Sequence, residues 1–232
     1  KNGKGVKIKT RFDNEVKDHR VRIMVPTGIN SDVHKADSVF EVVTRNNRHN
    51  AGWNNPSACE HEQGFVSIDD GEKGIAVANI GLYEYEMLPD LDNTIAVTIL
   101  RAVGEMGDWG VFPTPKAQCL GISKTEIEIV PFKGDLISSG AYEECYQFRT
   151  DIITADTDCH DGVMPLDYSM INWQGNGLIL TGIKQKGNGE DIILRWVNVS
   201  DKPTTLTIQK SDVIDNLYIS NIIEKKIKEI DS

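Results

Sequence analysis

Apolar and polar residues alternate with a period of two along most of the chain, which predicts β-strands rather than helices. In the first stretch Val6, Ile8 and Phe12 share one side, while lysines and Arg11 occupy the other. The same alternation predicts further strands over residues 21–25, 37–45, 92–104 and 124–132. The pattern therefore indicates an all-β fold.

Turn-forming residues join several of these strands into hairpins. The apolar runs 65–68 and 75–79 flank the polar residues 70–74, as in a hairpin. From about residue 165 the strands become shorter, with one hairpin turn expected at residues 187–189 and a second at 200–203. Short strands with tight turns are typical of a small sandwich. We therefore expect a large sandwich over residues 1–164 and a small β-sandwich domain over residues 165–232.

Two stretches have helical spacing instead. In SSGAYEECYQFRTDI, Ser138 or Ser139 is placed to cap a helix, and Tyr142, Cys145 and Arg149 recur at helical intervals. The C-terminal ISNIIEKKIKEI has isoleucines at suitable intervals for a helix, but it equally fits a final strand. The sequence thus predicts few, short helices and leaves the C-terminal segment open.

One strand ends in an unexpected residue. Residues 95–100 of DNTIAVTILRAVG are almost entirely apolar, and Arg101 follows them directly. An unpaired charge at the end of a core strand is destabilising, so this guanidinium should have either a partner or a function.

Composition excludes some functions. The chain carries 25 basic and 35 acidic residues, a formal net charge of −10, whereas nucleic-acid grooves need a basic stripe. The same balance disfavours docking on anionic lipid, and no apolar stretch approaches the roughly 20 residues that span a bilayer. We therefore expect neither a nucleic acid nor a membrane as partner.

The cysteines and the first residues bear on localisation. The four cysteines are widely spaced in a chain too long to need disulfides, so we interpret them as reduced thiols of a cytoplasmic protein. The opening KNGKGVKIKTRF is already strand-like and shows no signal peptide, as if it were cut from a longer protein.

The sequence contains no clear metal-binding or nucleophile motif. The acidic run DTDCHDG at 156–162 has His160 and Asp161 where a calcium loop needs an oxygen ligand and a glycine, and Cys59-Glu60-His61 is the other candidate for zinc. We interpret DTDCHDG as a polar turn. The sequence has no Gly-x-Ser-x-Gly elbow, and its cysteines and histidines suggest no catalytic dyad.

Paired carboxylates offer a further candidate. In GLYEYEMLPD an extended chain places Glu84 and Glu86 on one face, about 6–7 Å apart, in alternation with Tyr83 and Tyr85. Glycosidases use carboxyl pairs about 5–9 Å apart. The alternatives are a solvated strand face with aromatic cross-strand packing, or exposed rings that stack on a sugar.

Five ordered motifs carry a family resemblance. They are RFDNEVKDHRVRIMVPTGINSDVHKADSVFEVVTR, HEQGFVSIDDGEKGIAVANIGLYEYEML, TIAVTILRAVG, TPKAQCLG and ILRWVNVSDKPTTLTIQ. Together they closely resemble the C-terminal region of glycoside hydrolase family 38, in its bacterial α-mannosidase and mannosylglycerate-hydrolase branch. The resemblance covers nearly the whole chain.

This resemblance implies a division of labour within a larger enzyme. Family members are retaining, zinc-dependent α-mannosidases whose nucleophile and zinc ligands lie in an N-terminal α/β barrel. The chain would then be the non-catalytic part, a mutarotase-like supersandwich with a small β-sandwich, and it would contain neither a catalytic residue nor a metal site. Its implied partners are its own N-terminal catalytic domain and an α-mannoside or mannosylated small molecule, and a homodimer contact is left open.

The resemblance also implies site residues. Arg101 matches an arginine that reaches the active site, where it would hydrogen-bond substrate hydroxyls or orient a catalytic carboxylate. The alternative is an internal salt bridge to Glu84, Glu86 or Glu105. His61 is expected between domains or in the cleft, although Gly64 and the lack of a proline after His61 depart from the commoner pattern.

Two other classes of function remain. A free-standing carbohydrate-binding module would use Tyr83, Tyr85, Trp53, Trp109 or Trp173 as stacking platforms. An independent enzyme would use Glu84 and Glu86, and this requires them to lie on a concave surface.

Overall fold

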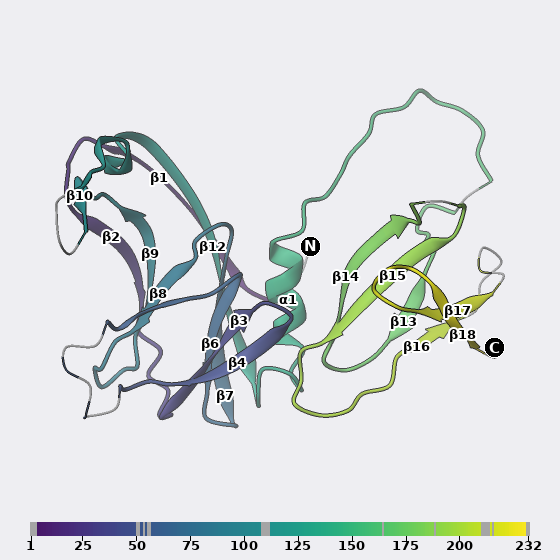
Figure 1. Cartoon of the computed structure of the whole chain (residues 1–232), viewed down its shortest axis with the longest axis horizontal. Helices are drawn as coiled ribbons and strands as arrows, with labels where there is room; N and C mark the ends of the chain where they lie inside the picture. The colour runs from purple at the N-terminus through teal and green to yellow at the C-terminus, as the bar shows by residue number, and fades with distance from the viewer. Residues whose placement is uncertain are drawn as a thin grey trace. The chain divides into compact units, whose positions relative to one another are not determined.

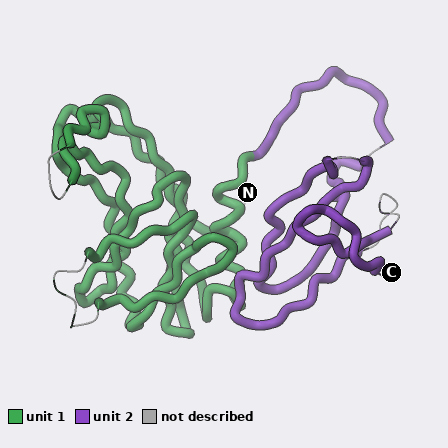
Figure 2. Tube along the Cα trace, in the orientation of Figure 1, with its two compact units in different colours: residues 1–151 green, residues 152–232 purple. Residues whose placement is uncertain are grey.

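A computed structural model describes residues 4–49, 52, 54, 57–107, 112–163, 165–187, 189–209, 214 and 216–230. The chain divides into two compact units, residues 1–151 and 152–232 (Figure 2). The predicted boundary after residue 164 falls between α1 and β13, where the structure describes no strand or helix. Each unit is described by itself.

The first unit contains two antiparallel sheets (Figure 1). The larger sheet has the order β1 (Val6–Asn14), β12 (Gly121–Lys133), β7 (Lys73–Asn79), β6 (Phe65–Asp69), β3 (Val33–Ser38), β4 (Glu41–Asn46). The smaller has the order β2 (Arg20–Val25), β9 (Ile95–Arg101), β8 (Glu84–Met87), β5 (Cys59–His61). Both sheets contribute to one hydrophobic core, with Val66, Val77 and Ile127 from the larger and Tyr85 and Val97 from the smaller. The expected sandwich is confirmed.

Shorter elements complete this unit. They are the hairpin of β10 (Glu105–Met106) and β11 (Phe112–Pro113), a 3₁₀ turn (Pro115–Gln118), and helix α1 (Ala141–Phe148). The helix occurs where Tyr142, Cys145 and Arg149 predict it, and it packs against β7 and β12. Tyr142 and Cys145 are fully buried, so helical spacing correctly identified the buried face.

The second unit consists of three two-stranded sheets in the described residues. The pairs are β14 (Leu178–Gln185) with β15 (Ile192–Asn198), β13 (Asn172–Gln174) with β16 (Thr207–Gln209), and β17 (Leu217–Ser220) with β18 (Lys226–Ile230). The β14–β15 hairpin confirms the expected turn near residues 187–189, although Asn188 itself lies outside the described residues. The C-terminal segment is a hairpin, so its strand alternative is the one observed.

Two strand predictions are wrong. Residues 37–45 do not form one strand, because Val39 and Phe40 make the turn between β3 and β4. Phe40 lies in the left-handed region, at φ 63°, which alternation of apolar residues does not reveal. The hairpin expected to turn at residues 200–203 is also wrong, since β16 pairs with β13 rather than with β15. The wide separation of these partners in sequence explains why a local turn pattern missed the pairing.

Candidate functional site

The outer face of the four-stranded sheet gathers charged side chains from β2, β8 and β9 and lies next to Cys59 and His61 of β5. The register sets Cys59 opposite Glu86 and His61 opposite Glu84, so alternate residues of β5 and β8 share this face. Tyr85 and its partner Glu60 have the opposite parity, and Tyr85 lies in the core. Period-two alternation thus separates a charged outer face from an inner face that packs into the sandwich.

A β-bulge decides which way Arg101 points. The register between β2 and β9 pairs Val21 with Leu100 but Arg22 with Thr98, so Ile99 is an extra residue in β9. By strict alternation Arg101 would share the inward parity of Ile95 and Val97, which are fully buried. The bulge reverses this parity and brings Arg101 to the same side as Thr98. This is how a charged residue can end a core strand.

Arg101 forms a bidentate ion pair with Glu84. Its Nε donates to Glu84 Oε2 at 3.0 Å and its Nη2 to Oε1 at 2.6 Å. Thr98 Oγ1 also donates to Oε1, at 2.7 Å. Burial raises the pKa of Glu84, but the hydrogen bonds from Arg101 and Thr98 outweigh burial and hold the pKa below its usual range. The ion pair expected as the alternative for Arg101 is therefore present, and it lies on the outer face.

Two further arginines extend this charged face. Arg20 Nη1 lies 3.6 Å from Glu84 Oε1, and its Nη2 lies 3.5 Å from Glu86 Oε2. Arg22 donates to Glu86 Oε2, and Arg20 Nη1 donates to the sulfur of Cys59 at 2.9 Å. Three guanidinium groups therefore surround two carboxylates, so both glutamates are engaged in ion pairs on this face.

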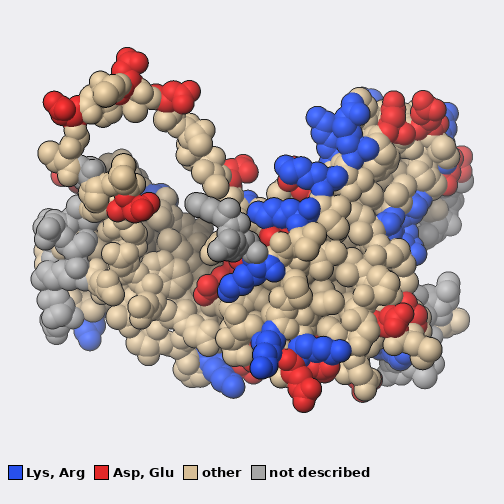
Figure 3. Space-filling model, turned by 180° about the vertical axis from the view of Figure 1, so that it is seen from behind, with Lys and Arg blue, Asp and Glu red and all other residues tan. Residues whose placement is uncertain are grey.

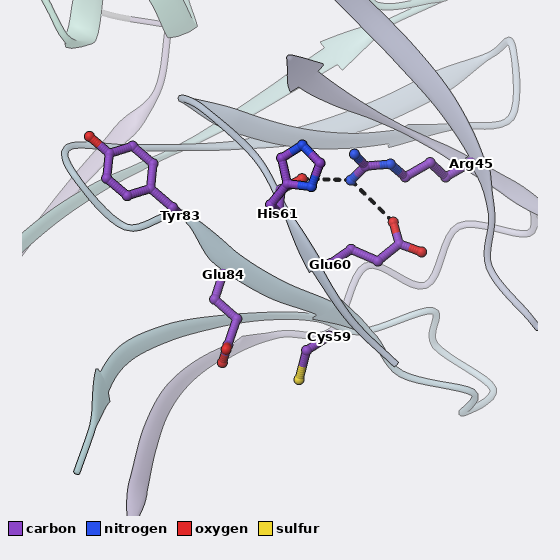
Figure 4. A pocket seen from close by; sticks show the side chains of 6 residues that line it. All are labelled: Arg45, Cys59, Glu60, His61, Tyr83 and Glu84. Atoms are coloured by element: carbon purple, nitrogen blue, oxygen red, sulfur yellow. Dashed lines mark hydrogen bonds and ion pairs between the residues drawn. The ribbon is translucent and has the colours of Figure 1, made fainter. Parts of the chain in front are cut away.

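A hollow of about 530 Å³ lies beside this network (Figure 4). Its lining combines charged, polar and aromatic side chains from β4, β5 and the start of β8: Arg45, Cys59, Glu60, His61, Tyr83 and Glu84. Tyr83 and Arg45 lie at opposite ends of the hollow, and Glu84 and Cys59 point to the same side. Such a mixture of one exposed ring with hydrogen-bonding groups suits a polar ligand with hydroxyl groups.

A hydrogen-bonded network anchors one wall of the hollow. Arg45 Nη1 donates to the backbone oxygen of His61 at 2.6 Å and lies 3.1 Å from Glu60 Oε2. The hydroxyl of Tyr85 donates to Glu60 at 2.9 Å and contacts His34 Nε2 at 2.7 Å. Burial raises the pKa of Glu60, but its hydrogen bonds and the Arg45 charge bring it below the usual value.

Of the site residues predicted from the sequence, some lie at the hollow and one is buried in the core. His61 and Tyr83 line the hollow, and Arg101 adjoins it through Glu84. Tyr83 is 61% exposed, whereas Tyr85 is fully buried. The expectation that Tyr85 presents its ring beside the acids is wrong, because the even and odd residues of β8 face opposite sides.

Of the tryptophans considered for stacking, Trp173 is described by the structure. Trp53 and Trp109 lie outside the described residues. Trp173 is half-buried in the second unit, where it packs edge-to-face against Trp196. The described residues thus offer Tyr83 as the aromatic side chain at the hollow.

The described residues bear on the metal, membrane and nucleic-acid alternatives. Within the described ranges no three His, Cys, Asp or Glu side chains converge as metal ligands would. Residues 156–162, the former metal candidate, are exposed and carry no regular structure. The same part of the chain contains no helix long and apolar enough to cross a bilayer. The face seen in Figure 3 carries both basic and acidic side chains.

Sequence reasoning missed several residues of this face. Arg20, Arg22 and Arg45 were not singled out from the sequence, although residues 21–25 were predicted as a strand. A signal for the first two is present, since two arginines at alternate positions of a strand must share a face. Arg45 could not be found this way, because its partner Glu60 belongs to a different sheet.

Two family models match the chain. Residues 1–106 match the glycosyl hydrolases family 38 C-terminal domain, and residues 177–232 match the family 38 C-terminal beta sandwich domain. A curated relative from Halalkalibacterium halodurans, named "Putative mannosylglycerate hydrolase", is 38% identical over 227 residues. The match covers 98% of this chain but 25% of that relative.

Solved structures agree with the family models. An alpha-mannosidase from Enterococcus faecalis V583 is 32% identical, with a TM-score of 0.88 over 100% of this chain and 26% of the other. A second structure, a glycosyl hydrolase family 38 protein from Enterococcus faecalis, is 31% identical, with a TM-score of 0.85, and 27% of it is covered. The chain therefore spans about a quarter of the length of the proteins it matches.

Proposed function

The chain is a C-terminal region of glycoside hydrolase family 38, and from this premise we propose that it is the non-catalytic β portion of an α-mannosidase. In this role it supports a catalytic domain elsewhere in the enzyme and completes one side of the sugar cleft. The relatives are about four times as long, which leaves room for such a domain.

Arg101 is the observation that carries the cleft role. The bulge in β9 turns its side chain outward, and the side chain remains 44% exposed although it ends a buried strand. The adjoining hollow offers an exposed ring, Tyr83, and hydrogen-bonding groups such as His61. A planar guanidinium beside such a hollow can donate to two hydroxyls of a sugar.

The proposed chemistry lies outside this chain. A retaining mannosidase uses one carboxylate as nucleophile and a second carboxyl group as acid and then base. Glu84 and Glu86 do not suit this pair, since both are bound to arginines and the pKa of Glu84 is lowered rather than raised. We accordingly assign the nucleophile, the general acid and the expected zinc ion to the catalytic domain.

The proposed ligand is an α-mannoside or a mannosylated small molecule, in line with the names of the relatives. Residence in the cytoplasm is part of the same proposal. It is supported by Cys59, Cys119, Cys145 and Cys159, which are all free thiols.

Catalysis by this chain alone is the first test. The purified chain, incubated with an aryl α-mannoside and zinc, should release no chromophore above background. Addition of the separately produced catalytic portion should restore release if the two parts associate. Turnover by the chain alone, after contaminating host mannosidase is excluded, would contradict the proposal.

Replacement of Arg101 tests the cleft role. In the full-length enzyme, Arg101→Lys should lower kcat/KM by about 10- to 1,000-fold, because an ammonium cannot reproduce the two parallel hydrogen bonds of a guanidinium. The melting temperature should change little, because exposed ion pairs contribute only about 0–1 kcal/mol. Unchanged kinetics would remove Arg101 from the cleft.

A free-standing carbohydrate-binding module is the second candidate. It is supported by the exposed ring of Tyr83 at the edge of the hollow. Binding of mannose or a mannoside by the isolated chain, lost in Tyr83→Ala, would favour this candidate over an accessory domain.

A further inference from the structure

We propose that Glu84 is a positioning residue that fixes the guanidinium of Arg101 for contact with the sugar. This inference rests on the proposed function of Arg101. Glu84 occupies two donors of that guanidinium, Nε and Nη2, at 3.0 and 2.6 Å. Within the described part of the chain no hydrogen bond engages Nη1, so this corner of the fork is available to a ligand.

Bidentate contact determines orientation as well as position. A single hydrogen bond would let the guanidinium rotate about its long, flexible side chain, whereas two parallel bonds to one carboxylate define its plane. The plane in turn defines the direction in which Nη1 donates. Preorganisation of this kind is what a contact that strengthens in a transition state requires.

Glu84 is itself held from two other directions. Thr98 donates to Oε1 at 2.7 Å from the neighbouring strand β9, and Arg20 Nη1 lies 3.6 Å from the same oxygen on the side of β2. Thr98 immediately precedes the extra residue Ile99, so the bulge brings both Thr98 and Arg101 to the same carboxylate. The orientation of Arg101 therefore depends on the pairing of three strands.

The carboxylate also resolves a repulsion. Arg20 and Arg101 are directly opposite in the β2–β9 register, and like charges in such a cross-strand pair repel. Glu84 contacts both guanidinium groups, which lets them coexist. Without Glu84, Arg101 would move away from Arg20 and lose the orientation that its free corner needs.

Glu86 provides a matched control. It lies on the same strand and face as Glu84 and binds Arg20 and Arg22, but no contact joins it to Arg101. It does not line the hollow. A general effect of lost charge on this face would therefore appear in both Glu84→Gln and Glu86→Gln, whereas a positioning effect would be confined to Glu84→Gln.

The experiment measures aryl α-mannoside hydrolysis by the full-length enzyme. Glu84→Gln should lower kcat/KM by about 10- to 100-fold, mainly through kcat, because the bidentate pair is lost. Glu86→Gln should stay within about threefold of the parent enzyme. Glu84→Asp keeps the charge and should recover part of the loss. Each glutamate pairs with two arginines, so Glu84→Gln and Glu86→Gln should lower the melting temperature by similar amounts, which separates positioning from structural damage.

A double-mutant cycle completes the test. If Glu84 acts through Arg101, Glu84→Gln combined with Arg101→Lys should be no slower than Arg101→Lys alone. Full additivity, or an equal loss in Glu86→Gln, would overturn the positioning role. A strong effect of Arg101→Lys with none from Glu84→Gln would overturn this inference and leave the proposed function standing. No effect of Arg101→Lys would overturn the proposed function itself.

Discussion

At the scale of single residues, the most unusual group of the first unit is Glu62. Its side chain is almost fully buried, with Oε1 bonded to the amide of Asn79 and no hydrogen-bond partner for Oε2 among the residues that the structure describes. Burial, together with the nearby charge of Asp37, raises the pKa of Glu62 to about 8, although Arg149, Asn79 and Arg45 act in the opposite direction. A neutral carboxyl group is therefore part of the folded state near pH 7.

Asp37 is the charged neighbour of this carboxyl group. It accepts hydrogen bonds from the hydroxyl of Tyr146 and from Arg149 Nη1, which lies 3.2 Å away. Arg149 crosses directly over Gly64, where a Cβ atom would lie 2.2 Å from its Nη1. The absent side chain at Gly64 thus lets Arg149 reach Asp37 and tie the end of α1 to the sheet.

Glu62 makes the stability of the first unit depend on pH. The folded state binds the proton of Glu62 more tightly than the unfolded state does, since the pKa is about 8 when folded and 4.5 ordinarily. The free energy of unfolding should therefore be highest below about pH 4.5, as far as Glu62 is concerned, and fall as pH rises to about 8. Glu62→Gln, which cannot ionise, should flatten this fall and be the more stable protein at pH 9, by an amount on the order of a few kcal/mol.

Urea denaturation at a series of pH values checks this prediction. The exposed Glu41→Gln serves as control, and its profile should parallel that of the parent protein. If Glu62→Gln keeps the parent slope between pH 5 and 8, then Glu62 is ionised in the folded state and the assignment is wrong.

At the scale of elements, hairpin β3–β4 carries the clearest local strain. Phe40 has a φ of 63° at the second position of a two-residue turn, and its side chain is 65% exposed. Left-handed backbone disfavours residues with a Cβ by roughly 1–2 kcal/mol, and asparagine tolerates it better than phenylalanine does. Little burial offsets the strain at this position.

Phe40→Asn should therefore stabilise the first unit by about 1 kcal/mol. Val39→Asn is the matched control, because Val39 is similarly exposed but has no positive φ, and it should not stabilise. Differential scanning calorimetry of both variants measures the effect. A lower melting temperature for Phe40→Asn would mean that the aromatic side chain contributes more than its exposure indicates.

At the scale of the whole molecule, the two units differ in their hydrophobic cores. The first has one large cluster of buried apolar residues from both sheets, whereas Leu178 and Val199, which are 6% and 7% exposed, are the buried apolar residues described in the second. Residues 152–163 belong to no strand or helix, are exposed throughout, and carry acidic side chains that are visible along the extended segment in Figure 3. Exposed chain without regular structure is where proteases cut first.

Limited proteolysis should separate the units at this segment. A protease that cuts before aspartate should cleave first at Asp156, Asp158 or Asp161 and leave a resistant fragment that ends near residue 155. Mass spectrometry of an early time course identifies the cuts. First cuts within β3, β6 or β7 would contradict this order of stability.

Features that depend on neighbours along the chain could be predicted before folding is considered. Alternation located the hairpin β6–β7 and most of the other strands, helical spacing located α1, and motifs identified the family. For the site, it named Arg101, His61 and Tyr83. These features were readable because a strand or a helix repeats over a few residues, so each local pattern carries its own evidence.

Features that depend on pairing across the sheets emerge from the folded chain. The bulge at Ile99 exists in the register of β9 against β2, and it alone turns Arg101 outward to Glu84. The burial of Tyr85 and the pairing of β16 with β13 arise in the same way, from partners distant in sequence. A shift of one residue in register moves every following side chain to the other face of the sheet. The direction in which a strand residue points is therefore a property of the sheet rather than of the strand.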